Sequence, residues 1–409
     1  MNVIDNRKQV SRFIMLFMTT YLASYLTRIN FGAVVSEIEI STGISKSLLS
    51  LSLTGSFVTY GLGQIVSGIL GDYVSPKKLI TLGFLLTISM NLCVPLLNDP
   101  YIMAMVWCIN GFAQAFMWPP LVKLMLALLS EEDYKKATVR VSWGSSIGTI
   151  LIYLVSPIFI KISGWKSVFI FSAVSASFML LLFIKNCVDI EVTKKEIQSK
   201  TKNTKFNLFH PVVIMIMLAI VLQGMLRDGV TTWMPSLINE TYHLGSSISI
   251  LTSVVLPIFS ILSFSLTSKI YTKWIQNPLI LSGVLFGVGT LSTCCLIFFN
   301  GYHAIVSVLL GALLTGCMHG VNLILVCMLP AYFKSTGSVG AISGIFNSCT
   351  YVGSAISTYG VAYLVDTYNW MVALKIWLVV ALSGALICFI CKSMWNKYKL
   401  YLDQFSYKE

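Results

Sequence analysis

The segment Tyr21-Leu-Ala-Ser-Tyr-Leu-Thr-Arg-Ile-Asn-Phe31 places Arg28 near the middle of a long apolar stretch. The segment Leu226-Arg-Asp-Gly-Val-Thr-Thr-Trp-Met-Pro235 does the same with Arg227 in the second half of the chain. A permanent cation in such a stretch is costly and is usually retained for a functional reason. The shared setting predicts a duplicated chain whose two arginines meet at its centre.

Two arginines at one site predict an anion clamp in a transporter. If the halves fold alike and face each other across an axis along the membrane normal, Arg28 and Arg227 meet near the midplane. Each guanidinium presents a planar fork of donors to carboxylate or phosphate oxygens. The alternative is a pair of structural arginines that bind backbone carbonyls or extend to the headgroups, although positions in mid-segment make such extension difficult.

The composition predicts a polytopic helical membrane protein. Of 409 residues, 56% are apolar and 11% are charged, mean hydropathy is +0.81, and apolar runs of roughly 20 residues recur from end to end. The expected fold is all-α, with twelve transmembrane helices in two pseudo-symmetric six-helix bundles. The bundles are expected at 1–187 and 209–409, joined by a polar cytoplasmic linker at 188–208.

The positive charges indicate orientation in the membrane. The net charge is +12, but few of the 28 Lys and Arg residues fall in segments expected outside the cell. Those outside are Lys46, Lys161, Lys166 and Lys375. This asymmetry predicts a multi-pass plasma membrane protein with both termini in the cytoplasm, and it argues against a nucleic-acid partner.

The polar residues show no pattern typical of an enzyme or a metal site. The ten cysteines lie mostly in apolar segments, and neither Cys294-Cys295 nor Cys388-x-x-Cys391 has further ligands nearby in sequence. We therefore expect no cofactor, no metal and no catalysis. The protein is expected to be a monomer in the bilayer.

Aromatic residues accompany the first arginine. Tyr21, Tyr25 and Arg28 are spaced at i, i+4 and i+7, so they share one face of the first span, about 11–35. That face is expected to line the substrate pathway.

The fourth span, about 101–129, contains a predicted break. The Pro119-Pro120 step removes two backbone donors, so it should kink or break the helix and open polar backbone toward a cavity. Gln114, Trp118 and Lys123 of this span are candidate substrate-binding residues. Lys123 lies nearer the cytoplasm, and its side chain could instead extend to the headgroups.

Pairs of residues support the duplication. An offset of 205 residues carries Gly111 onto Gly316 and Gly148 onto Gly353. Two landmarks in one register favour a repeat of six plus six helices.

The turn after the second span resembles a loop of the major facilitator superfamily. The stretch Gly68-Ile-Leu-Gly-Asp-Tyr-Val-Ser-Pro-Lys-Lys78 matches that loop at five positions and departs from it at Tyr73, Ser75 and Pro76. The resemblance implies that Asp72, Lys77 and Lys78 act in gating. A chance turn with an aspartate helix cap is the alternative.

Within that superfamily, the chain resembles the organophosphate:phosphate antiporters, the group of the glycerol-3-phosphate and hexose-phosphate transporters. The resemblance rests on four helices, with the matching patterns Tyr25-Leu-x-Arg28-x-Asn30-Phe31, Gln114 to Trp118-Pro-Pro with Lys123, Arg227-x-Gly229-Val230-x-x-Trp233-x-Pro235, and Tyr351 with Gly353. It implies rocker-switch alternating access between two bundles. It also implies that Arg28 and Arg227 bind the phosphate of either substrate, and that inorganic phosphate is exchanged for the ester.

Three residues depart from the pattern of this group. Ile29 replaces a frequent lysine, Ser145 falls near a usual histidine, and Asp228 replaces an aromatic residue beside Arg227. Adjacent helical residues point about 100° apart, so Asp228 need not contact the ligand of Arg227. Asp228 could pair with another cation or carry a proton.

A histidine in the second half is a further coupling candidate. His319 lies within a span, at the position equivalent to Gln114, and a histidine titrates near neutrality. A buried neutral histidine bonded to a carbonyl or hydroxyl is the alternative.

Three functions remain open. The favoured one is transport of a small organic anion, most simply a phosphate ester exchanged for inorganic phosphate. The second is proton-coupled symport of a carboxylate such as a sugar acid, with Asp228 or His319 as proton carrier. The third is a transporter-like membrane sensor of a phosphate ester.

Overall fold

The computed structural model describes residues 6–71, 73–189, 210–336 and 339–406. These ranges are almost entirely helical and contain no strand, which confirms the all-α expectation. Most of the expected linker, 188–208, and Asp72 of the expected gating turn lie outside the described residues.

The first half forms six helical rods. They are α1 (Arg7–Thr42), α2 (Lys46–Leu70), α3 (Pro76–Cys93) with a 3-10 turn at Val94–Leu96, the broken rod of α4 (Pro100–Gln114) and α5 (Trp118–Leu128), α6 (Glu131–Ser163) and α7 (Lys166–Asn186). Polar N-caps begin several of them, as where the Ser45 hydroxyl accepts from the Leu48 amide and Asp99 from the Tyr101 amide.

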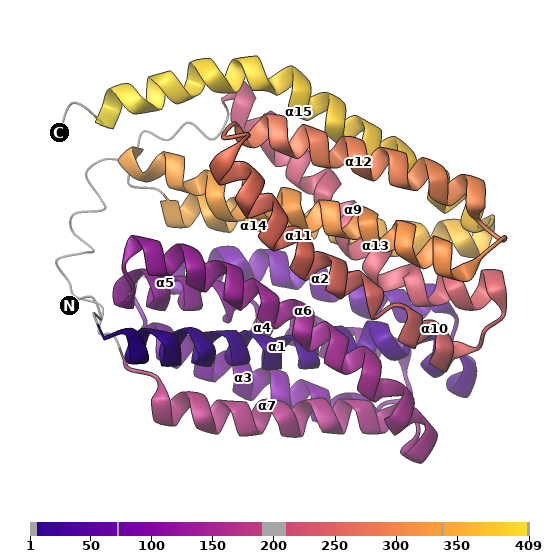
Figure 1. The fold of residues 1–409 in the computed structure, drawn as a ribbon. Coiled ribbons are helices and arrows are strands. Elements are labelled where there is room, and N and C mark those ends of the chain that lie inside the picture. The colour runs from indigo at the N-terminus through magenta and orange to yellow at the C-terminus, as the bar shows by residue number, and fades with distance from the viewer. Residues whose placement is uncertain (1–5, 72, 190–209, 337–338, 407–409) are drawn as a thin grey trace.

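The second half repeats the arrangement. Its rods are α9 (Pro211–Tyr242), α10 (Ser246–Thr252) with α11 (Val255–Lys273), α12 (Pro278–Phe299), α13 (Ala304–Asn322) with a π-helical continuation at Leu323–Met328 and a 3-10 segment at Leu329–Thr336, α14 (Val339–Thr367) and α15 (Trp370–Ser406). The two halves are separate groups of helices (Figure 1). Helix α1 begins and α15 ends at the same end of the molecule, which we call the termini end; the opposite end is the far end.

Ten helical segments of the described chain are long and apolar enough to cross a membrane. Helices α1 and α14 are outside that set. They carry Arg28 and Tyr351, and the polar residues that they turn toward the interior lower their hydropathy. Together the twelve rods form the predicted two-bundle architecture.

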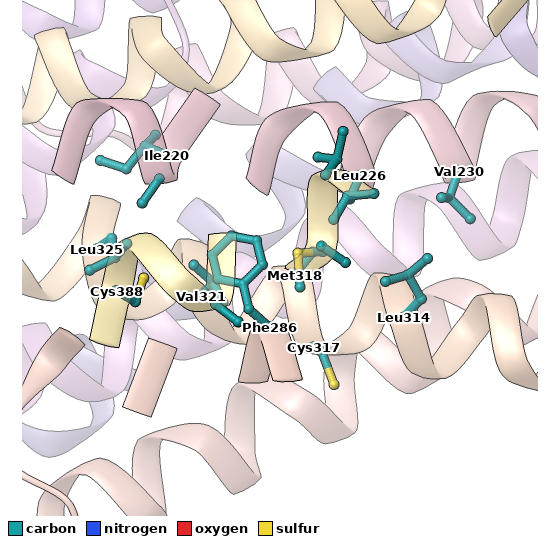
Figure 2. Close-up of a cluster of buried hydrophobic side chains, with 14 of the residues drawn as sticks. Ile220, Leu226, Val230, Phe286, Leu314, Cys317, Met318, Val321, Leu325 and Cys388 are labelled. Carbon is teal, nitrogen blue, oxygen red and sulfur yellow. The ribbon is translucent and has the colours of Figure 1, made fainter. Parts of the chain in front are cut away.

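Each half has its own apolar core. In the second half, side chains from α9, α12, α13 and α15 interdigitate around Phe286, and Ile220, Leu226 and Met318 are almost fully buried beside it (Figure 2). In the first half, the rings of Phe31, Trp107 and Phe169 form the centre of a similar cluster.

Close helix crossings recur at equivalent places in the two halves. A Cβ on Gly148 of α6 would lie 2.7 Å from the Leu22 carbonyl oxygen of α1, and one on Gly353 of α14 would lie 1.9 Å from the Val221 oxygen of α9. Only glycine allows two backbones to approach so closely. The fifth rod of each half thus crosses the first rod near the arginine, as the duplication predicts.

The two halves meet along α2 with α14 and along α6 with α11. Within the first interface, Asn347 donates to the Gln64 side chain at 2.9 Å and Ser348 donates to the Gly61 carbonyl at 2.7 Å. These contacts run beside the level of Arg28, so they form one wall of the central region.

Polar contacts also join the halves at the far end. Lys46 of α2 pairs with Glu240 of α9 and lies 3.8 Å from Glu39 of α1. The indole of Trp370 donates to the other oxygen of Glu240 at 2.9 Å. Ser47 donates to Asp366 of α14. We call this group the far-end latch; it holds the two bundles together on that side.

Candidate anion-binding site

Arg28 lies in a box of aromatic rings. Its guanidinium carbon is 4.1 Å from the ring centroid of Tyr60, 4.9 Å from Tyr351, 5.4 Å from Tyr25 and 6.0 Å from Phe57. Each ring presents its negative face to a cation, and burial strengthens that attraction. The box stabilises the charge of Arg28 without neutralising it, so an anion can still be attracted.

Arg227 lies in a different environment. Its Nε donates to Oδ1 of Asp228 and its Nη2 donates to Oδ2, each at 2.7 Å. The Ser354 hydroxyl of α14 donates to the same Oδ2 at 2.6 Å. The side chains of Arg227 and Asp228 are 7% and 16% exposed. The cation and the carboxylate therefore neutralise each other inside the protein.

Tyr351 connects the two arginines. Its ring centroid is 4.9 Å from the Arg28 guanidinium carbon and 5.7 Å from that of Arg227. The three residues come from α1, α9 and α14, so both halves of the chain contribute to one site. The structure thus brings Arg28 and Arg227 together, as the repeat predicted.

Two cavities lie between the bundles at this level. The first is lined by Tyr21, Tyr25, Trp118, Arg227, His319, Asn322, Asn347 and Tyr351, among others. The second is lined by hydroxyls of α6 together with Tyr25, Arg227, Asp228, Ser260 and His319. Arg227 borders both spaces, whereas Arg28 is not among the residues that line either.

The aromatic residues expected on the pathway do gather there. The Tyr21 ring lies 5.2 Å from Tyr25 and 5.1 Å from Trp118, measured between centroids. His319 borders both cavities, and its ring lies 5.3 Å from Phe264. Trp118 reaches the cavity because the fourth rod breaks at residues 115–117, which confirms the predicted break; the two prolines occupy the first turn of α5.

Gln114 lies elsewhere. Its amide donates to the Ser24 carbonyl at 3.1 Å and to the Thr27 hydroxyl at 2.9 Å, and the residue is almost fully buried between α4 and α1. Asn91 and Asn110 also donate to the Thr27 carbonyl. Gln114 therefore joins a polar network that fixes α1, the helix that carries Arg28.

The remaining predicted cations lie toward the termini end. Lys123 of α5 donates to the Gly71 carbonyl, and Lys77 donates to the Cys187 carbonyl at 2.7 Å. Lys78 is exposed on the first turn of α3. Lys123 and Lys77 connect segments of the first bundle, and none of the three lysines is among the residues that line either cavity.

Sequence reasoning missed three residues of the site. Tyr60 and Phe57 supply two walls of the box around Arg28, and Ser354 holds the Asp228 carboxylate. Ser354 follows Tyr351 by three positions, so it shares a helical face with a residue that had been identified. Nothing in the spacing of Phe57 and Tyr60 indicated that α2 crosses Arg28.

The amino-acid sequence matches the model of a family of membrane proteins. The model of the Major Facilitator Superfamily covers residues 17–358, most of the chain. The chain belongs to the major facilitator superfamily. The predicted superfamily, and with it the assignment to transporters instead of enzymes, is confirmed.

The chain resembles transporters named for phosphate esters and a membrane sensor protein. The glycerol-3-phosphate transporter of Bacillus subtilis is 25% identical over 403 residues, which are 90% of this chain and 89% of that one. The membrane sensor protein UhpC of Escherichia coli is 22% identical over 384 residues, 86% of this chain and 84% of that one. A probable hexose phosphate transport protein of Chlamydia trachomatis is 27% identical over 148 residues, 36% and 32% of the two chains.

A solved structure has the same fold. The xylose transporter XylE of E. coli, in a partially occluded inward open conformation, superimposes with a TM-score of 0.73 over 93% of this chain and 97% of that one. Its sequence identity is 13%, so the likeness concerns the fold. The chain is a multi-pass membrane protein of the superfamily, and its relatives suggest a small anionic substrate.

Proposed function

We propose that this superfamily member transports a small organophosphate across the plasma membrane, and that inorganic phosphate uses the same site, so that one exchanges for the other. The observation that carries the proposal is the approach of Arg28 and Arg227, from opposite bundles, to the single ring of Tyr351. A phosphate group has enough oxygens to accept from two guanidinium forks at once.

The two bundles, 1–187 and 209–409, would rock about this site. In the proposed orientation the termini end is cytoplasmic, in keeping with the distribution of Lys and Arg. The far-end latch then closes the outer side, and an anion reaches Arg227 from the cytoplasm. Opening of the latch and closure of the termini end would present the same site outside. The protein would act as a monomer in the bilayer.

Uptake of labelled phosphate into proteoliposomes tests this function. Vesicles loaded with phosphate or glycerol 3-phosphate should take up labelled phosphate, and external glycerol 3-phosphate should compete. Arg28→Ala and Arg227→Ala should both lower uptake strongly, and the loss should be larger in Arg28→Ala. Lys161→Ala, which removes an exposed cation near the end of α6, is the matched control and should behave as wild type. Uptake that persists in both arginine variants would reject the site.

A second candidate is proton-coupled symport of a carboxylate. One observation favours it: Asp228 and His319 border the same cavity beside Arg227, where two titratable groups could exchange a proton. Under this function, the same vesicles would accumulate a sugar acid when the outside is acidic and would ignore phosphate. A sensor, as in the UhpC relative, would bind the ester without moving it.

A further inference from the structure

The strongest unexplained feature is that Arg227 already holds an anion. Asp228 takes the Nε and Nη2 donors, which form one edge of the guanidinium fork, through both of its carboxylate oxygens. A phosphate or carboxylate substrate binds bidentately through such an edge. Asp228 and a substrate that binds this edge therefore exclude each other.

Burial makes this pairing important in the empty protein. An unpaired buried cation carries a desolvation penalty of several kcal/mol, and a paired one avoids most of it. The usual physical argument for obligatory exchange is that an empty clamp leaves its cations unpaired and so cannot easily change conformation. Here that argument fails for Arg227, because Asp228 accompanies it within the same helix. The aromatic rings around Arg28 already stabilise its charge when the site is empty.

The described surroundings can also receive the carboxylate once it is displaced. Ser354 of α14 already donates to Oδ2 and need not move. The second cavity adds Tyr25 of α1, hydroxyls of α6, and His319 of α13 around Asp228. A displaced carboxylate would therefore face polar groups on several elements instead of lipid-like side chains.

We propose that Asp228 is an internal substitute for the substrate: it pairs with Arg227 when the site is empty, yields that edge to the incoming anion, and lets the empty carrier change conformation. The inference rests on the proposed function, since it takes Arg227 to bind the transported anion. Its consequence is that exchange is not obligatory, and net movement of the anion accompanies it.

The test compares net uptake with exchange in the same preparation. Labelled phosphate is supplied to proteoliposomes that contain either phosphate or chloride alone. Wild type should show net uptake into chloride vesicles within about tenfold of its exchange rate. Asp228→Asn should lower the ratio of net uptake to exchange by about tenfold or more, because an unpaired Arg227 penalises the empty carrier.

Two further variants separate charge from packing. Glu132→Gln removes an exposed carboxylate at the other end of the molecule and should keep the wild-type ratio of net uptake to exchange. Ser354→Ala keeps the charge of Asp228 but removes one of its donors, so the ratio should fall less than in Asp228→Asn. An Asp228→Asn protein with the wild-type ratio, or a wild type with no net uptake, would overturn the proposal.

A readout without substrate distinguishes failure of this proposal from failure of the proposed function. If wild type exchanges neither phosphate nor glycerol 3-phosphate, the substrate assignment is wrong. Hydrogen exchange at 236–242, beside the far-end latch, still reports how often the empty carrier opens there. Asp228→Asn should slow that exchange severalfold if the internal counter-anion operates. Equal hydrogen-exchange rates in wild type and Asp228→Asn would reject the internal counter-anion whatever the substrate is. This measurement needs no transport, so it remains informative even if Asp228→Asn reconstitutes poorly into vesicles.

Discussion

The carboxylate of Asp228 lies 2.7 Å from the Nε of Arg227, its neighbour on α9. In the first half, the residue that follows Arg28 is the apolar Ile29. The two arginines, one from each bundle, therefore have different roles: Arg227 is neutralised within its own helix, and Arg28 keeps its charge among aromatic rings. The site is electrically asymmetric, and substitutions at its two ends should have different consequences.

Substitution of Arg28 should be the most damaging single change at the site. Arg28→Ala removes the cation that the rings leave available, and we expect kcat/KM for phosphate exchange to fall by about 100-fold or more. Arg28→Lys keeps a charge but loses the planar fork, so an intermediate loss of about tenfold is expected. Transport kinetics in proteoliposomes measure both. Equal activity of the lysine variant and wild type would show that charge alone suffices.

Tyr351 should act through its ring more than its hydroxyl. The ring faces both guanidinium groups, and each buried cation–π contact contributes about 0.5–2 kcal/mol. Tyr351→Phe should therefore retain most of the substrate affinity, whereas Tyr351→Ala should weaken it by about tenfold. Competition by glycerol 3-phosphate gives the affinity. If Tyr351→Phe were as defective as Tyr351→Ala, the hydroxyl would be the important group.

The far-end latch should oppose opening on that side. Lys46 is almost fully buried and pairs with Glu240, so removal of one partner leaves the other poorly compensated. Lys46→Gln and Glu240→Gln should each speed hydrogen exchange at 236–242. The exchange rate of the double variant should be close to that of either single variant, because the two residues act as a pair. The exposed Lys136–Glu132 pair at the other end offers the control, Lys136→Gln. Full additivity would show that the pair is not coupled.

The glycine crossings should tolerate no side chain. A Cβ at position 353 would lie 1.9 Å from the Val221 oxygen, and one at position 148 would lie 2.7 Å from the Leu22 oxygen. Gly353→Ala and Gly148→Ala should lower the thermal midpoint in detergent, the first more than the second, by overpacking costs of about 1–3 kcal/mol. Gly287→Ala is the control, because nothing lies within 4 Å of its added Cβ. An unchanged midpoint for Gly353→Ala would mean that the helices can separate there.

The thiol of Cys187 should be unreactive at neutral pH. Burial raises its pKa to about 12, although Lys77 opposes that shift, and thiol reagents attack the thiolate. Below the pKa of a thiol, its thiolate fraction grows about tenfold per pH unit. The rate of Cys187 alkylation, followed by mass spectrometry, should therefore rise throughout the range from pH 7 to 10. A plateau near pH 9 would place the pKa in the ordinary range.

Local spacing alone determined a large part of this protein. The apolar runs fixed a polytopic helical chain, because a bilayer admits little else. The spacing of Tyr21, Tyr25 and Arg28 placed them on one face because a helix has a fixed period. The step at Pro119 and Pro120 predicted the break in the fourth rod for an equally local reason.

The tertiary structure decided what these residues contact. Tyr60 and Tyr351 reach Arg28 from helices distant in sequence, and no local period relates them to it. Gln114 turned toward Thr27, since donors of α4 satisfy carbonyls of α1 where the two helices cross. Asp228 and Arg227 begin about 100° apart on α9, yet the long arginine side chain folds back onto the carboxylate because burial leaves both charges in need of a partner. Sequence supplied the two charges, and packing determined that they pair.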